Sequence, residues 1–134
     1  QPHLFIGVPR IYEKVYSNLM AALGSKLGLL KIPVLGGLIK NKAKAKIGFS
    51  NVTYAITGAA PINPDILELF HTLGIPLYEG YGMTETTAGA TLNYGGNNRI
   101  GSVGKPLEGS DLRIADPNEK GDGEIQFHVR MILY

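Results

Sequence analysis

Residues 80 to 86 carry the side chains best suited to chemistry, and we call them the Gly80 segment. They read Gly-Tyr-Gly-Met-Thr-Glu-Thr and follow an apolar stretch typical of a buried strand. Glycine lets backbone approach a ligand closely, and the ring of Tyr81 offers a π face to a planar base. The hydroxyl of Thr84 can donate to a phosphate oxygen, and Glu85 is a hard oxygen ligand of the kind Mg²⁺ accepts. The segment is therefore predicted to hold a nucleotide and its metal ion.

A second small-residue turn, Gly58-Ala59-Ala60-Pro61, is called the Gly58 loop. It follows an apolar, β-branched run at residues 52–57, and the Gly80 segment follows another predicted strand at residues 75–79. Between them Asn63 can cap a helix that begins at Pro64 and stops at Gly74.

Strand, helix and strand in this order predict a parallel βαβ unit. Both turns then leave the carboxyl ends of neighbouring strands, where open α/β sheets bind ligands. We expect the Gly58 loop and the Gly80 segment to form two walls of one site. For Glu85 alone, a solvated carboxylate near a helix start is the alternative, and the facing loop favours the metal role.

The flanking regions differ in how clearly they can be interpreted. Residues 3–8 predict a short strand, and Pro9 then begins an amphipathic helix that ends before Gly24. Residues 25–50 contain several glycines and a proline, and we expect short helical pieces and loops there.

Beyond about residue 92 the composition becomes rich in turn-forming residues, and we expect a subdomain boundary near residues 95 to 100. Apolar and polar residues then alternate around Leu112 to Ile114 and again from Ile125 through Met131. This alternation predicts a β-hairpin with one solvent-exposed face. The predicted fold class is α/β: a parallel βαβ portion of a doubly wound sheet, then the start of an antiparallel β-barrel-like subdomain. The predicted division is residues 1–96, an α/β nucleotide-binding subdomain, and residues 97–134, a truncated β subdomain.

Charge and composition exclude several classes of protein. The 134 residues carry a formal charge of +2 and no cysteine, so no disulfide or cysteine metal site is possible. Seven lysines and no acid lie between residues 14 and 64; a solvated lysine-rich helix or loop is favoured, with a peripheral membrane contact as the alternative. Nucleic acid is not expected as a partner, because no aromatic residue interleaves the lysines. No signal peptide or membrane span is visible, which favours a cytoplasmic location.

The sequence does not match the motifs of other nucleotide-binding, zinc or hydrolase sites. Gly104-Lys105 lacks the other residues of a phosphate-binding P-loop, and Glu85 stands where a dinucleotide fingerprint needs its third glycine. The three histidines are far apart in sequence, and no serine lies in a nucleophile elbow, so a zinc site and a serine hydrolase are not expected.

The ordered set of motifs resembles the AMP-binding acyl-adenylate-forming superfamily, in particular its long-chain fatty acyl-CoA synthetase branch. The resemblance covers nearly the whole chain except roughly residues 25 to 50. It is carried by VPRIYEK at residues 8–14, GAAP at 58–61, LGIPLYEGYGMTE at 73–85, GSVGKP at 101–106 and GEI at 123–125.

The resemblance implies a two-step ligase that uses ATP, Mg²⁺ and CoA. A fatty carboxylate attacks the α-phosphate of ATP to give acyl-AMP, and the CoA thiol then displaces AMP. By resemblance Thr84 and Glu85 are the catalytic residues, Glu85 also binds the metal, and Tyr81 stacks on adenine. The implied nucleotide-binding set comprises Gly58, Ala59, Ala60, Pro61, Gly80, Tyr81, Gly82, Met83 and Thr84. Of these, Gly80 and Gly82 would also border the carboxyl end of the acyl chain.

The chain starts without an initiator methionine and stops within an apolar run, which predicts an internal fragment of a longer polypeptide. By resemblance, the phosphate loop would lie upstream of it, and the ribose-binding Asp and catalytic Lys downstream. The isolated chain is therefore expected to be inactive. The alternatives are another adenylate-forming enzyme, which loads a carrier protein or oxidises its product, and a non-catalytic binding or membrane-surface module. Oligomeric state is open.

Overall fold

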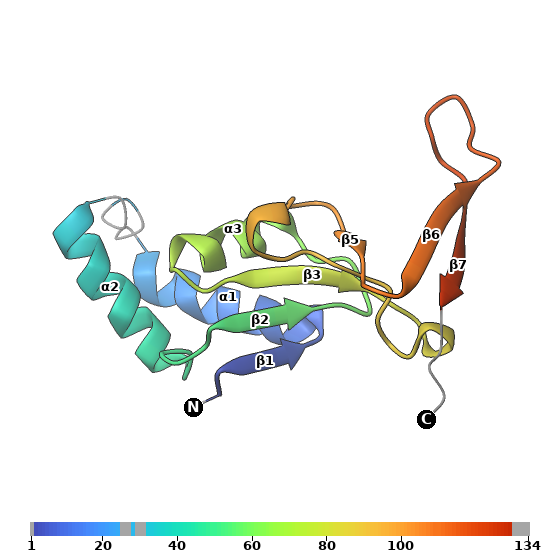
Figure 1. Ribbon diagram of the computed structural model, residues 1–134. Coiled ribbons are helices and arrows are strands. Elements are labelled where there is room, and N and C mark those ends of the chain that lie inside the picture. Colours follow the sequence, from blue (N-terminus) through green and yellow to red (C-terminus); the bar gives the residue numbers. More distant parts are fainter. Residues whose placement is uncertain (1, 25–27, 29–31, 130–134) are drawn as a thin grey trace.

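The described part of the chain forms one mixed five-stranded sheet and one separate hairpin (Figure 1). The computed structural model describes residues 2–24, 28 and 32–129. The large sheet has the order β1-β2-β3-β4-β5, in which the first three strands are parallel and the last two antiparallel. Its strands are β1 (Leu4–Gly7), β2 (Tyr54–Thr57), β3 (Leu77–Tyr81), β4 (Thr91–Leu92) and β5 (Lys105–Pro106). The predicted α/β class with a parallel βαβ unit is confirmed.

Two helices begin and end where local signals predicted. In α1 (Pro9–Leu23) proline occupies the first turn, and Gly24 follows at φ 45°, a conformation that glycine adopts without strain. In α3 (Pro64–Thr72) the side-chain oxygen of Asn63 accepts a hydrogen bond from the backbone N–H of Asp65 at 2.9 Å. These ends fix the lengths of both helices.

The expectation of short pieces across residues 25–50 is wrong where the structure describes that region. A single helix, α2 (Pro33–Lys46), spans 14 residues; residues 25–27 and 29–31 lie outside the described part. A glycine within a helix costs about 1 kcal/mol relative to alanine, but the Lys- and Ala-rich second half consists of strong helix formers. Lys42 and Lys46, four residues apart, share an exposed side of α2, while Lys40 and Lys44 lie on a second, partly buried side, so the four lysines do not share one face. No helix in the described ranges is long and apolar enough to cross a membrane.

Strand β3 continues two residues beyond its predicted end at Glu79. Gly80 and Tyr81 pair with Leu92 and Thr91 of the antiparallel β4. The sequence analysis did not predict β4, because a strand of two residues has no recognisable pattern. The beginning of the Gly80 segment is therefore strand and not loop.

The predicted hairpin is confirmed as β6 (Ser110–Ala115) and β7 (Glu124–Val129). Its register places Leu112 opposite Phe127 and Ile114 opposite Ile125. Both isoleucines are more than 40% exposed, so the apolar face is only partly covered by described residues. The predicted continuation of the strand to Met131 lies outside the described part, and the division into residues 1–96 and 97–134 stays a prediction.

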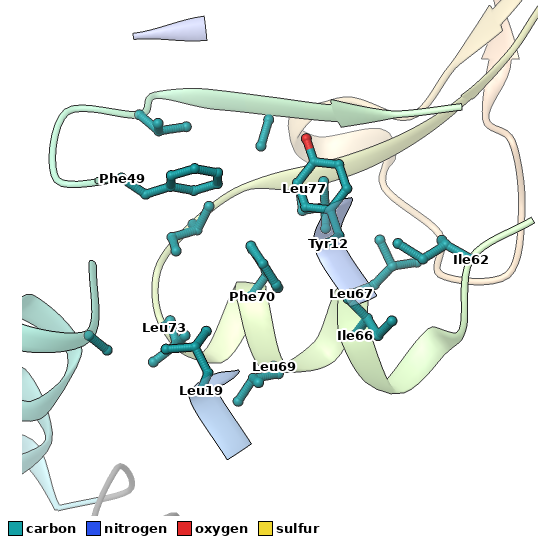
Figure 2. Packing of buried hydrophobic residues seen from close by; sticks show 14 of the residues in the cluster. Tyr12, Leu19, Phe49, Ile62, Ile66, Leu67, Leu69, Phe70, Leu73 and Leu77 are labelled. Atoms are coloured by element: carbon teal, nitrogen blue, oxygen red, sulfur yellow. The ribbon is translucent and has the colours of Figure 1, made fainter. Parts of the chain in front are cut away.

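The hydrophobic core lies between the parallel strands and helices α1 and α3 (Figure 2). Tyr12 and Phe70 are fully buried and pack edge to face, with ring centroids 5.5 Å apart. The hydroxyl of Tyr12 donates to the carbonyl oxygen of Ile56 at 3.0 Å, which ties α1 to β2. On the opposite face of the sheet Leu4 and Ile6 are exposed, because side chains alternate along a strand and the helices cover one face. The core thus holds the strands whose carboxyl ends carry the two turns.

Candidate functional site

A cavity of about 990 Å³ opens at the carboxyl ends of β2 and β3. Its lining residues place it at the end of the sheet toward which β1, β2 and β3 run, and the arrowheads of these strands mark that end in Figure 1. The Gly58 loop and the Gly80 segment both contribute to its wall. Its lining comprises residues 6–8, 56–59, 80–84, 87–89, 91, 92 and 107.

Seven of the predicted site residues meet at this cavity. They are Gly58, Ala59, Gly80, Tyr81, Gly82, Met83 and Thr84. The remaining three, Ala60, Pro61 and Glu85, are exposed and do not line it. The carboxylate of Glu85 lies on a short 3-10 helix, η2 (Thr84–Thr86), that follows β3. Within the described residues, no three His, Asp or Glu side chains form a metal-binding group.

Close packing favours glycine at residues 58 and 80. A Cβ atom on Gly58 would lie 3.0 Å from the carbonyl oxygen of Gly80. A Cβ atom on Gly80 would lie 3.1 Å from the Cδ1 atom of Leu92. These distances are shorter than ordinary van der Waals contact, so the missing side chain at Gly58 lets the two turns approach each other, and the one at Gly80 lets β3 pack closely against Leu92 of β4.

Gly82 is required by the segment that follows it. A Cβ atom there would lie 2.2 Å from the carbonyl oxygen of Ala88, inside any permitted contact distance. The turn between them is closed by Thr86, whose hydroxyl oxygen accepts from the N–H of Met83 at 3.0 Å and donates to the carbonyl of the same residue at 3.1 Å. The sequence analysis gave Gly82 roles in nucleotide binding and beside an acyl chain, whereas the atom nearest to an added Cβ in the structure belongs to the backbone of Ala88.

Three cavity-lining residues other than glycine adopt positive φ angles. These angles are 70° at Ala59, 53° at Thr87 and 66° at Ala88. The left-handed conformation costs a residue with a Cβ atom about 1–2 kcal/mol. Backbone strain of this kind concentrates at ligand sites, where the surrounding structure enforces it.

Two buried polar residues beside the cavity were missed by sequence reasoning. Thr57 and Glu79 are register partners on β2 and β3, and their exposed fractions are 0% and 8%. The Thr57 hydroxyl has no hydrogen-bond partner among the described residues. Burial raises the pKa of the Glu79 carboxyl, and a hydrogen bond from the backbone of Ile62 partly opposes that rise. Thr57 and Glu79 each end a predicted apolar strand, and a polar residue at that position could have identified them from the sequence.

An aromatic contact joins the site to the hairpin. The rings of Tyr81 and Phe127 are stacked, with centroids 5.9 Å apart and planes 17° from parallel. The sequence placed Phe127 only within the alternating pattern of a strand. One face of the ring predicted to receive adenine is thus packed against another element of the chain.

The chain is similar to known proteins in sequence and in fold. A family model described as AMP-binding enzyme matches residues 1–128. The long-chain-fatty-acid–CoA ligase ACSBG2 of Xenopus laevis is 34% identical over 99% of the chain and 22% of that protein. The long-chain-fatty-acid–CoA ligase FadD15 of Mycobacterium bovis is 31% identical over 89% of the chain and 24% of that protein.

A solved structure has the same fold. ATP-bound MatB from Rhodopseudomonas palustris superposes with a TM-score of 0.62 and 28% identity, over 96% of this chain and 22% of that one. The chain spans less than a quarter of the length of each of these three proteins.

Proposed function

Because the chain belongs to the family of AMP-binding enzymes, we propose that it supplies the adenine and metal side of the active site in a long-chain fatty acid–CoA ligase. The observation that carries the proposal is the single cavity lined by both the Gly58 loop and the Gly80 segment. The fatty acid–CoA ligases of Xenopus laevis and Mycobacterium bovis, at 34% and 31% identity, support the choice of branch.

The proposed reaction has two steps. A carboxylate oxygen of the fatty acid attacks the α-phosphorus of ATP, and pyrophosphate leaves with the bonding electrons of the broken P–O bond. The deprotonated thiol of CoA then attacks the acyl carbon of acyl-AMP, and AMP leaves. A carboxylate is a weak nucleophile, so positioning and neutralisation of phosphate charge are expected to supply most of the rate.

The nucleotide is proposed to lie against the ring of Tyr81. An aromatic ring offers a flat apolar face to adenine, and Ala59, which lines the cavity at a positive φ angle, would border the base from the other wall. The hydroxyl of Thr84 lines the same cavity and would donate to a phosphate oxygen. Gly58 lets these groups come together because it adds no side chain against the backbone of Gly80.

Glu85 is proposed to bind the magnesium ion. Its exposed carboxylate directly follows Thr84 and fits a metal that takes most of its ligands from phosphate and water. When bound, Mg²⁺ would neutralise charge on the phosphate oxygens. A single carboxylate is sufficient for that role when phosphate and water supply the other ligands.

The apolar part of the cavity wall is proposed to receive the carboxyl end of a fatty acid. Ile6, Val8, Ile56, Leu92 and Leu107 line the same cavity as the nucleotide-binding residues. Burial of methylene groups stabilises a bound chain by about 0.8 kcal/mol per group. An apolar carboxylic acid is therefore favoured over a polar one.

The test is ATP–pyrophosphate exchange and CoA thioester formation by the full-length protein that carries this chain. Palmitate-dependent exchange is expected, and Glu85→Ala should reduce kcat/KM for exchange by roughly 10- to 100-fold, as for groups that hold or orient a catalytic metal. Glu119→Ala, which removes an exposed carboxylate from the hairpin turn, is the matched control and should leave exchange unchanged. Wild-type exchange kinetics in Glu85→Ala would contradict the metal role.

The isolated 134-residue chain is expected to give no exchange with any fatty acid. It spans less than a quarter of the fatty acid–CoA ligases that it matches, so most of their active-site machinery would lie on other residues. Robust exchange by the purified chain would contradict this expectation.

A further inference from the structure

The stacked pair of Tyr81 and Phe127 joins elements that are distant in sequence. Tyr81 ends β3 in the five-stranded sheet, and Phe127 belongs to β7 in the separate hairpin. Their rings are nearly parallel, 17° apart, with 5.9 Å between centroids. This distance and angle describe an offset stack, one of the favoured arrangements of two aromatic rings.

The two faces of the Tyr81 ring are not equivalent. Tyr81 lines the large cavity, whereas Phe127 is absent from the lining residues described for it. Phe127 therefore covers one face of the ring from the hairpin side, and the ring remains accessible from the cavity. A planar ligand in the cavity would complete a three-layer stack of base, tyrosine and phenylalanine.

We propose that Phe127 is a positioning residue that holds the Tyr81 ring in the orientation that receives the base. The inference rests on the proposed function for the nucleotide and adds a second residue to it. An unsupported tyrosine turns about its side-chain torsions, and fixing them on binding costs conformational entropy. Phe127 restricts the ring before the ligand arrives, so less of that entropy is lost in the complex.

Neighbouring residues of the hairpin do not offer an equivalent contact. Ile125 is on the same face of β7 two residues earlier, and it is 44% exposed. The aromatic stacking described for Tyr81 is with Phe127. Ile125 thus provides a control that changes the same face of the hairpin without removing the stack.

The experiment measures the dissociation constants of ATP and of tripolyphosphate for the full-length protein. Phe127→Leu is expected to weaken ATP binding about 2- to 10-fold, as estimated for one aromatic pair, while tripolyphosphate, which lacks a base, binds as before. Phe127→Tyr keeps a ring and should restore wild-type affinity for ATP. Ile125→Ala should leave both constants unchanged.

A double-variant experiment distinguishes a positioning role of Phe127 from a general role in packing. In a Tyr81→Leu protein, Phe127→Leu should have no further effect on ATP binding, because Phe127 acts through the tyrosine ring. Equal losses for ATP and tripolyphosphate, additive losses in the double variant, or tighter ATP binding in Phe127→Leu would each overturn the proposal.

Failure of the proposal and failure of the proposed function give different results. If the wild-type protein binds ATP and Phe127→Leu binds it equally well, only the positioning role is overturned. If the wild-type protein binds no adenine nucleotide, the proposed function is overturned and the positioning role is overturned with it.

Discussion

Replacement of Gly82 by alanine tests whether the loop between β3 and β4 is held by backbone packing. The added Cβ atom would lie 2.2 Å from the carbonyl oxygen and 2.5 Å from the carbonyl carbon of Ala88. Relief to an ordinary contact of 3.4 Å requires the two segments to separate by about 1 Å, since 3.4 minus 2.2 is 1.2. Backbone on both sides makes that movement costly, because no flexible side chain can turn away.

The movement would strain hydrogen bonds that close the same loop. The N–H of Ala88 donates to the carbonyl of Met83 at 2.9 Å, and the N–H of Ala90 donates to the carbonyl of Tyr81 at 2.9 Å. Overpacking costs about 1–3 kcal/mol, and each weakened hydrogen bond adds about 0.5–1.5 kcal/mol. We expect Gly82→Ala to destabilise the protein by roughly 2–4 kcal/mol and to displace the cavity-lining residues that follow it.

The assay is thermal unfolding and ATP binding of the full-length protein, with Gly96→Ala as control. A Cβ atom on Gly96 would meet nothing within 4 Å, so that variant should unfold and bind ATP as the wild type does. Gly82→Ala should unfold at a lower temperature and bind ATP more weakly. If Gly82→Ala matched the control in both measurements, the packing argument would be refuted.

Three further substitutions are expected to change stability in different ways: one raises it, one lowers it and one alters its dependence on pH. Gly37→Ala should stabilise α2 by about 0.5–1 kcal/mol, measured by chemical denaturation, because a Cβ atom there meets nothing within 4 Å and alanine is the better helix former; destabilisation would count against it. Tyr12→Phe should destabilise the protein by about 1 kcal/mol through loss of the buried hydrogen bond to Ile56, and an unchanged unfolding midpoint would show that this bond contributes nothing. Glu79→Gln should flatten the dependence of the unfolding midpoint on pH. Because burial raises the pKa of Glu79 in the folded state, its contribution to stability is greatest below the unfolded value near 4.5 and is lost as the pH rises through the folded value. An amide does not ionise, so persistence of the wild-type slope in Glu79→Gln would assign that slope to other groups.

Local signals predicted the elements that local chemistry determines. Asn63 as a cap and Gly24 as a helix end depend on a few adjacent residues, and both were found where the sequence placed them. The parallel pairing of β2 with β3 followed from the order strand, helix, strand. These features need no knowledge of distant contacts.

Features that depend on distant partners were not predictable. Strand β4 is two residues long and exists because it pairs with the end of β3 and with β5. The stack of Phe127 on Tyr81 depends on how the hairpin meets the sheet, which alternation along one strand does not reveal. The length of α2 was missed because the several glycines and the proline of residues 25–50 were given more weight than the strong helix formers in its second half.

The uncovered face of the parallel sheet affects how the segment behaves in solution. Leu4, Ile6 and Tyr54 are each more than half exposed, and β1 is an edge strand of the described sheet. An apolar face beside an open strand edge is a template for aggregation. During refolding, this face would favour self-association of the segment when it is produced alone. Expressing the segment as part of a longer polypeptide that covers this face should reduce its aggregation.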